Sequence, residues 1–128
     1  MPVTEVFNND EFESYVYDKN EEKNGPKHGK KHIVIDFFAT WCGPCKKFAP
    51  VYEKLSEEYN DCAEFIKINI EKFDDLIGEY SITALPTFII LDTGKKESPY
   101  KPIIGTTGNQ LKNKLESLCK DIEISDDF

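Results

Sequence analysis

The sequence predicts an α/β fold in which helices cover both faces of a central sheet, and three observations support this. Residues 33–39 and 87–91 are almost wholly apolar, which is typical of strands buried on both faces. Between residues 45 and 59, apolar side chains recur at spacings of three and four, as on one face of a helix. The 128 residues can bury a real core without metal or structural disulfides, so we expect a single domain over residues 1–128.

The amino-terminal elements are short. Residues 3–7 alternate like a strand, and Asn8 followed by Glu11 predicts the start of a helix that carries Phe12, Tyr15 and Val16. Residues 18–31 are polar and contain two glycines and a proline, so we interpret them as an exposed loop.

Two histidines near this loop raise the question of a metal site. His28 and His32 are four residues apart, but no cysteine or carboxylate framework surrounds them. A pair of solvated histidines is therefore favoured over a pair of metal ligands.

The middle of the chain predicts a strand, helix, strand unit. A helix with one buried stripe follows residues 33–39, and Pro50 should bend this helix without ending it, because the stripe continues beyond it. Residues 65–70 then form a strand, which should run parallel to the first through a right-handed crossover. The stripe consists of Cys45, Phe48, Tyr52, Leu55 and Tyr59.

The carboxy-terminal third predicts a hairpin between two helices. A short helix near residues 73–80 precedes a strand at 87–91, a turn at 92–94 and an antiparallel strand at 100–104. Thr107 and Gln110 form a capping box for a last helix. We expect residues 121–128 to be an acidic, frayed tail. The inward positions of the last helix are Leu111, Leu115, Leu118 and Ile122.

Composition excludes several classes of function. With 24 acidic and 16 basic residues the formal net charge is -8, which argues against a nucleic-acid partner. No apolar run approaches the ~18 residues of a membrane span, and the first ten residues lack the pattern of a secretory signal. Four cysteines are too few for a disulfide scaffold and suit a reducing compartment. We therefore expect a protein of the cytoplasm with no membrane or nucleic-acid partner.

The run Trp41, Cys42, Gly43, Pro44, Cys45 lies between a predicted strand and a predicted helix. This context puts Cys42 at a helix N-terminus, where free N–H groups and the macrodipole stabilise an anion. The effect is large enough to lower the pKa of a thiol from ~8.5 toward neutrality. We expect Cys42 to be the nucleophile and Cys45, one turn deeper, to be the thiol that resolves a mixed disulfide.

Two other interpretations of this pair are an inert disulfide and half of a zinc site. Zinc would require a second paired motif, whereas Cys62 and Cys119 stand alone in the sequence. These two are most simply interpreted as small buried apolar residues, and a regulatory or dimer-forming disulfide is the alternative.

Asp36 lies in the middle of an apolar strand, where burial should raise the pKa of its carboxyl. The helix that follows doubles back over this strand, so Asp36 could lie beneath Cys45 and accept its proton. Lys67, the one charged residue in the strand predicted at 65–70, is a candidate partner across the sheet. The alternative is a buried ion pair that matters only for folding.

For two further residues, Pro86 and Trp41, the sequence allows two interpretations each. Pro86 opens a central strand and is a candidate for a cis peptide bond, against an ordinary trans turn. Trp41 is either an apolar contact for a substrate or a packing residue.

Residues 36–50, DFFATWCGPCKKFAP, strongly resemble the active-site segment of the thioredoxin family. The resemblance extends to ALPTF at 84–88, to KINI at 67–70 and to the turn glycines Gly94 and Gly105. It implies a thioredoxin fold, with a five-stranded mixed sheet in the order 1-3-2-4-5 and four flanking helices. It also implies that Pro86 is cis.

The resemblance assigns a role to each site residue. Cys42 resembles the attacking thiol, Cys45 the resolving thiol, Asp36 the buried carboxylate and Lys67 its charge partner. An extended substrate segment would then lie on an apolar rim and backbone edge formed by Trp41, Gly43, Pro44, Ala84, Leu85, Pro86 and Gly105.

The implied activity is reduction of disulfides in target proteins such as peroxiredoxins. An NADPH-dependent thioredoxin reductase would recharge the dithiol, so this electron carrier would bind no cofactor or metal and act as a monomer. Pro44 agrees with a reductant. Residues 18–31 and 95–102 are longer than in a minimal member of the family, which leaves partner choice open.

Two alternatives from other classes stand beside this assignment. One is a redox-gated binding module that clamps a partner in one oxidation state without turnover. The other is oxidase or isomerase work in an oxidising lumen, which Pro44 and the absence of a signal sequence disfavour.

Overall fold

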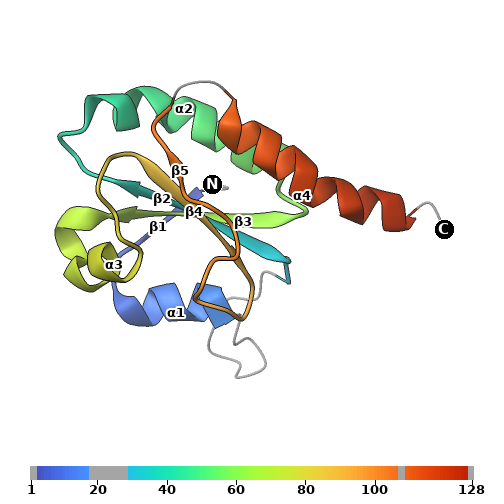
Figure 1. The fold of residues 1–128 in the computed structure, drawn as a ribbon, viewed down its shortest axis with the longest axis horizontal. Coiled ribbons are helices and arrows are strands. Elements are labelled where there is room, and N and C mark those ends of the chain that lie inside the picture. The colour runs from blue at the N-terminus through green and yellow to red at the C-terminus, as the bar shows by residue number, and fades with distance from the viewer. Residues whose placement is uncertain (1–2, 18–28, 107–108, 127–128) are drawn as a thin grey trace.

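A five-stranded mixed sheet forms the centre of the computed structural model, which describes residues 3–17, 29–106 and 109–126 (Figure 1). The strands lie in the order β1-β3-β2-β4-β5, with β1, β3 and β2 parallel and both β4 and β5 antiparallel to their neighbours. This confirms the predicted fold class, the strand order, the parallel pairing of β2 with β3 and the antiparallel pairing of β4 with β5. The strands are β1 (Val3–Val6), β2 (His32–Phe38), β3 (Ala63–Asn69), β4 (Thr87–Asp92) and β5 (Ile103–Ile104).

Four α-helices cover the two faces of the sheet in the described part of the chain. Figure 1 shows α2 and α4 on one face and α1 and α3 on the other. Because helices cover both faces, β2 and β4 are buried along nearly their whole length, which explains their continuous apolar runs. The helices are α1 (Asn9–Tyr17), α2 (Gly43–Glu58), α3 (Asp74–Glu79) and α4 (Gln110–Asp126), and a 3-10 turn, η2 (Ile70–Lys72), precedes α3.

Each face of the sheet has its own apolar core. Alternate side chains of β2 point to opposite faces, so that Val34 packs under α2 and α4, while Ile33 and Ile35 pack against the α1 side. Tyr52 of α2 is buried in the first core, and its hydroxyl donates to the carbonyl oxygens of Val34 (3.1 Å) and Ile66 (2.8 Å). The helix that carries the cysteines is thereby fixed to two neighbouring strands.

Two helix predictions are supported by local contacts. The amide of Glu11 donates to the Asn8 side chain (2.8 Å), and the Glu11 carboxylate accepts from the amide of Phe7 (2.8 Å), as expected for a capped start of α1. α2 continues through Pro50, because its buried stripe holds the helix on the sheet on both sides of that residue. Residues 18–28 and Thr107 lie outside the described residues, and with them most of the predicted loop, His28 and the capping box of α4.

Three boundaries differ from the predictions. Ile70 lies in η2 rather than in β3, because the Asn69 side chain accepts from the amide of Glu71 and turns the chain. β5 is confined to two residues, since Pro99 and Pro102 lack the N–H groups that a longer ladder needs. α4 continues to Asp126, so the segment that we predicted to fray is helical over most of its length.

The interpretation of His32 as a solvated loop residue is wrong. His32 is the first residue of β2, is buried, and its Nδ1 lies 3.0 Å from Oδ1 of Asp92 at the end of β4. The same Asp92 oxygen accepts from the hydroxyl of Tyr100 (3.0 Å). The pairing of β2 with β4 thus places Asp92 opposite His32 and gives its ring a hydrogen-bond partner, although the sequence had suggested that His32 belongs to a loop.

The interpretation of Cys62 and Cys119 simply as small buried apolar residues, rather than as a disulfide, is also wrong. Both are buried, as expected, but they form a disulfide with a Cα–Cα distance of 5.6 Å. α4 lies over the sheet next to the start of β3, and this brings together two residues 57 positions apart. The core therefore contains a disulfide, which the sequence analysis had kept only as the alternative interpretation of these two cysteines.

In the described residues, no helix combines the length and the apolar character needed to cross a bilayer.

Candidate active site

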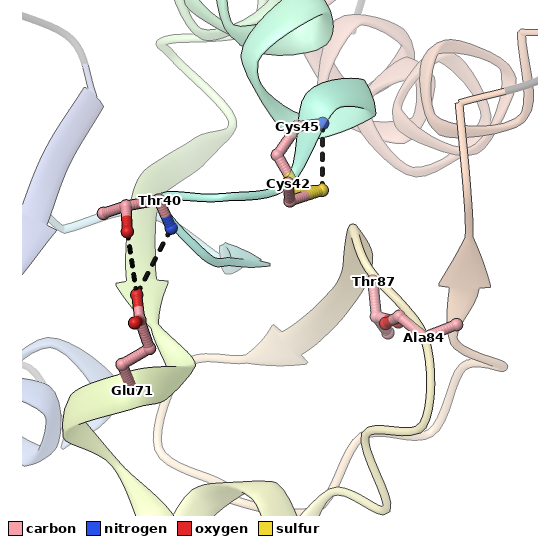
Figure 2. Close-up of a disulfide and its surroundings, with 6 residues drawn as sticks. All are labelled: Thr40, Cys42, Cys45, Glu71, Ala84 and Thr87. Atoms are coloured by element: carbon pink, nitrogen blue, oxygen red, sulfur yellow. Dashed lines mark hydrogen bonds between the residues drawn. A yellow bond between two sulfur atoms is a disulfide. The ribbon is translucent and has the colours of Figure 1, made fainter.

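A disulfide between Cys42 and Cys45 lies where the chain leaves β2 and enters α2, with a Cα–Cα distance of 5.3 Å. Cys42 is the N-cap of α2 and has an extended backbone conformation (φ -84°, ψ 110°). Its sulfur accepts a hydrogen bond from the amide of Cys45 at 3.2 Å, which Figure 2 shows. The sulfur thus occupies the position in which helices commonly place a serine or aspartate oxygen.

Pro44 is compatible with this position because the first turn of a helix does not use its N–H groups in the backbone ladder. Gly43 leaves open space around its Cα, so the turn of the disulfide is uncrowded. The free amides and the dipole of a 16-residue helix are therefore directed at the sulfur of Cys42, as the sequence predicted.

The exposed fraction of the side chain differs sharply between the two cysteines and Trp41. Cys42 and Cys45 are only 5% and 7% exposed, whereas Trp41 is 68% exposed. Trp41 is therefore not a packing residue, and its ring offers an apolar surface immediately before the attacking sulfur.

Asp36 is buried on β2, and among the described residues its Oδ1 has no hydrogen-bond partner. Burial raises the pKa of this carboxyl to about 7, and the positive charge of Lys67 partly opposes the rise. Lys67 is the residue directly opposite Asp36 in the pairing of β2 with β3, and its Nζ lies 5.4 Å from the centre of the Phe38 ring.

A cavity of about 310 Å³ joins this carboxyl to the disulfide. Its walls bring Asp36 and Lys67 from the sheet together with Cys45 and Tyr52 from α2, so the inner cysteine and the carboxyl face the same space. The remaining lining residues are Val3, Phe38, Ala39, Thr40, Lys46, Ala49 and Glu53.

A second depression of about 390 Å³ borders the disulfide on the side of Cys42. It contains five of the predicted substrate residues, and the sequence had missed three others, Ile70, Ile82 and Thr83. These three follow β3 or precede Pro86, and their apolar or small side chains gave no indication in the sequence of a role in substrate binding. The predicted members are Trp41, Gly43, Pro44, Ala84 and Leu85.

The peptide bond between Leu85 and Pro86 is cis, as the resemblance implied. The carbonyl of Pro86 accepts from the amide of Gly105 (2.8 Å), and the hydroxyl of Thr87 donates to the carbonyl of Ala84 (2.6 Å). Gly105 has a φ of 82°, a conformation that favours glycine. Figure 2 shows Ala84 and Thr87 on the segment that faces the disulfide.

Glu71 is a further residue that sequence reasoning missed. Its Oε1 accepts from both the amide (3.3 Å) and the hydroxyl (3.0 Å) of Thr40, and Figure 2 shows it reaching the segment before Cys42 from η2. The two residues are 31 positions apart, so only the fold reveals the contact.

The thioredoxin family profile matches residues 3–121 of the chain. Thioredoxin-2 of Saccharomyces cerevisiae is 37% identical over 89 residues, which are 70% of this chain and 82% of that protein. A thioredoxin from Nicotiana alata has a solved structure that matches with a TM-score of 0.72 at 31% identity, over 91% of this chain and 92% of the other.

A yeast structure, solved to explain thiol resolution in a mitochondrial 1-Cys peroxiredoxin via glutathione/thioredoxin systems, matches with a TM-score of 0.68. It is 32% identical, and the match covers 91% of this chain and 95% of the other. Family, fold and the Cys42–Cys45 pair agree with one another. The chain therefore belongs to the thioredoxin family of disulfide oxidoreductases.

Proposed function

We propose that the chain reduces disulfides of target proteins through Cys42 and Cys45, and that an NADPH-dependent thioredoxin reductase returns the oxidised form to the dithiol. The observation that carries the proposal is the sulfur of Cys42 at the N-cap of α2, where the amide of Cys45 donates to it. The same contact would stabilise a thiolate, which is the attacking species in disulfide exchange.

In the first step the thiolate of Cys42 attacks one sulfur of the target disulfide. A bond forms between Cys42 and the target, and the second target sulfur leaves as a thiolate. The target would lie along the depression beside Cys42, with Trp41 and Leu85 as apolar contacts and the backbone near Pro86 and Gly105 at its edge. Gly43, Pro44 and Ala84 leave room for an extended backbone there.

In the second step Cys45 loses its proton and attacks the sulfur of Cys42. The target leaves as a dithiol and this chain becomes the disulfide. Asp36 is the proposed proton acceptor, because its carboxyl shares a cavity with Cys45 and the carboxyl pKa of about 7 suits proton transfer near neutral pH. Lys67 would favour the ionised carboxylate from the neighbouring strand.

We propose a monomeric electron carrier of the cytoplasm, which maintains cell redox homeostasis and has peroxiredoxins among its targets. The match to a yeast structure from work on a 1-Cys peroxiredoxin supports the last point. The dominance of acidic over basic residues favours protein partners over nucleic acid.

The test is reduction of insulin disulfides with NADPH and a thioredoxin reductase. We expect the wild-type chain to support many turnovers, Cys42→Ser to support none, and Cys45→Ser to accumulate a covalent complex with the target that a strong thiol releases. Multiple turnovers distinguish this cycle from a redox-gated clamp.

Wild-type activity in the Cys42→Ser variant would contradict the assignment of the nucleophile. Activity with dithiothreitol but not with any thioredoxin reductase would contradict only the proposed source of electrons.

A further inference from the structure

The second disulfide, between Cys62 and Cys119, has no part in the exchange cycle. Cys62 immediately precedes β3 and Cys119 lies on α4, and the two are 4% and 9% exposed. The carbonyl of Cys62 accepts from the amide of His32 at 3.4 Å, so the backbone on the β3 side is held by the first residue of β2.

The two disulfides lie at opposite ends of the sheet. Cys42 follows the carboxyl end of β2, whereas Cys62 is at the amino end of the parallel strand β3. Seven residues of β3 separate these ends, which at ~3.3 Å per residue is about 20 Å. The thiolate of Cys42 therefore cannot reach the Cys62–Cys119 bond of its own chain.

A reductant from solution would first have to displace α4. Leu115, one turn before Cys119, is completely buried, and Leu111 is also in the core under this helix. Exposed fraction does not separate the two bonds, because Cys42 and Cys45 are themselves only 5% and 7% exposed. What differs is that Cys42 borders an open depression at the start of its helix, whereas Cys119 lies within α4 in the core that this helix covers. Approach of an attacking sulfur in line with the Cys62–Cys119 bond therefore requires α4 to move.

We propose that Cys62–Cys119 is a second redox centre, which stays oxidised while Cys42–Cys45 cycles and becomes reducible by dithiols only when α4 separates from the sheet. Its reduction would follow ordinary exchange. One thiolate of the dithiol breaks the Cys62–Cys119 bond to form a mixed disulfide, and the second thiolate resolves it. The donor becomes a disulfide, and Cys62 and Cys119 become thiols.

The direct test is the order of reduction in the native chain. The oxidised protein is incubated with dithiothreitol, the thiols are alkylated at intervals, and each cysteine is followed by mass spectrometry of its peptide. We expect Cys42 and Cys45 to be labelled at least about 100-fold faster than Cys62 and Cys119. Equal rates, or free thiols at Cys62 and Cys119 in the protein before reduction, would overturn the proposal.

A matched pair of variants tests the role of α4. Leu115→Ala weakens the docking of α4, whereas Leu76→Ala makes the same change on α3, in the core on the other face of the sheet. We expect Leu115→Ala to accelerate labelling of Cys62 and Cys119 by at least about tenfold more than Leu76→Ala. Equal acceleration in the two variants, or none in Leu115→Ala, would overturn opening through α4.

Leu118→Ala provides a milder change if Leu115→Ala does not fold. Leu118 is partly buried against the same core and adjoins Cys119 in the sequence. Leu118→Ala should likewise accelerate labelling of Cys62 and Cys119 more than Leu76→Ala does. Equal acceleration in the two variants, or none in Leu118→Ala, would overturn opening through α4.

A third measurement uses the chain as its own reductant. A variant with Cys42→Ser and Cys45→Ser retains only the second disulfide, and we expect it to stay oxidised when mixed with an excess of reduced wild-type chain. Rapid transfer between the two, visible as a mass increase of two hydrogen atoms in the variant, would overturn the isolation of the second centre.

Discussion

Asp36 combines two properties that rarely occur together at one carboxyl. It is buried, and among the described residues no donor reaches its Oδ1. Burial raises its pKa to about 7, although Lys67 opposes the change. Near neutral pH both protonation states are therefore populated, which is the condition for efficient proton transfer with a thiol.

The first prediction concerns the rate at which Cys45 resolves a mixed disulfide. Asp36→Asn should slow this step by roughly 10²-fold at pH 7, because an amide cannot accept the proton of Cys45. The wild-type rate should fall as the pH drops below about 7, where the carboxyl retains its proton. Stopped-flow release of a thiol from a preformed mixed disulfide measures both effects.

Glu53→Gln is the matched control for this step, because Glu53 is a second carboxylate that lines the same cavity. We expect its resolving rate and pH profile to match the wild type. A profile that keeps its inflection near pH 7 in Asp36→Asn would exclude Asp36 as the proton acceptor.

The second prediction concerns the stability of the oxidised form. The carboxyl pKa of Asp36 is raised from 3.8 to about 7 on folding, so the folded chain binds its proton more tightly than the unfolded chain. This stabilisation is fully present below pH ~4 and is lost as the pH rises through about 7, a change of roughly 4 kcal/mol.

Asp36→Asn lacks this titration. Between pH 4 and pH 8, the free energy of unfolding of the wild type should therefore fall by roughly 3–4 kcal/mol relative to that of the variant. Urea unfolding of both oxidised chains at the two pH values checks this. A difference that stays constant with pH would show that the carboxyl titrates normally.

For single residues, the sequence was most informative where a residue's own chemistry and its immediate neighbours were enough to define its environment. An aspartate among apolar neighbours was enough to predict a raised pKa, and a cysteine before a helix was enough to predict its N-cap position. His32 was misinterpreted because its partner, Asp92, comes from β4, and a local pattern contains no information on such a neighbour.

At the scale of elements, the segment between β2 and α2 determines where the sulfur of Cys42 lies. Thr40 connects this segment to η2 through two hydrogen bonds to one oxygen of Glu71. Both side chains are exposed, so the contact contributes little to stability, but it restricts the residues just before the N-cap.

The third prediction is that Glu71→Ala lowers kcat/KM for protein disulfides by roughly 3- to 10-fold and the free energy of unfolding by no more than about 1 kcal/mol. Glu57→Ala, the same change at an exposed position of α2, should leave kcat/KM unchanged and serves as the control. An equal loss of activity in both variants would attribute the effect to net charge rather than to Thr40.

Most elements could be predicted because their boundaries are set by nearby residues. The continuous apolar runs gave β2 and β4, and Asn8 with Glu11 gave the start of α1. β5 was overestimated, because its apolar residues suggested a strand while Pro99 and Pro102 limit its pairing. Ile70 was assigned to β3 because the turn depends on the side chain of Asn69.

At the scale of the whole molecule, the Cys62–Cys119 bond joins elements that are far apart in the chain. It closes a loop with a sequence separation of 57 between the start of β3 and α4. A cross-link of this span removes conformational freedom mainly from the unfolded chain, and the loop-entropy model gives about 4 kcal/mol.

The fourth prediction follows from this bond. The double variant Cys62→Ala, Cys119→Ala should lose roughly 2–4 kcal/mol of stability and about 10 °C in Tm, with insulin reduction at 25 °C unchanged. Calorimetry of the wild-type and variant chains measures the loss. If the two chains melt at the same temperature, the bond does not stabilise the fold.

Sequence spacing could not predict this pairing. Cys62 and Cys119 meet only because α4 crosses the face of the sheet that α2 also covers, an arrangement that no local pattern encodes. The resemblance to the thioredoxin family predicted the fold, but it contained no statement about these two positions.

Trp41 is the only tryptophan in the sequence, it is 68% exposed, and it directly precedes a sulfur that alternates between two oxidation states. Excited indole rings lose their energy readily to a nearby disulfide and less readily to thiols. The fluorescence of Trp41 should therefore increase when the Cys42–Cys45 bond is reduced. The unlabelled protein can thus report its own redox state, and this signal should not respond to the distant Cys62–Cys119 pair.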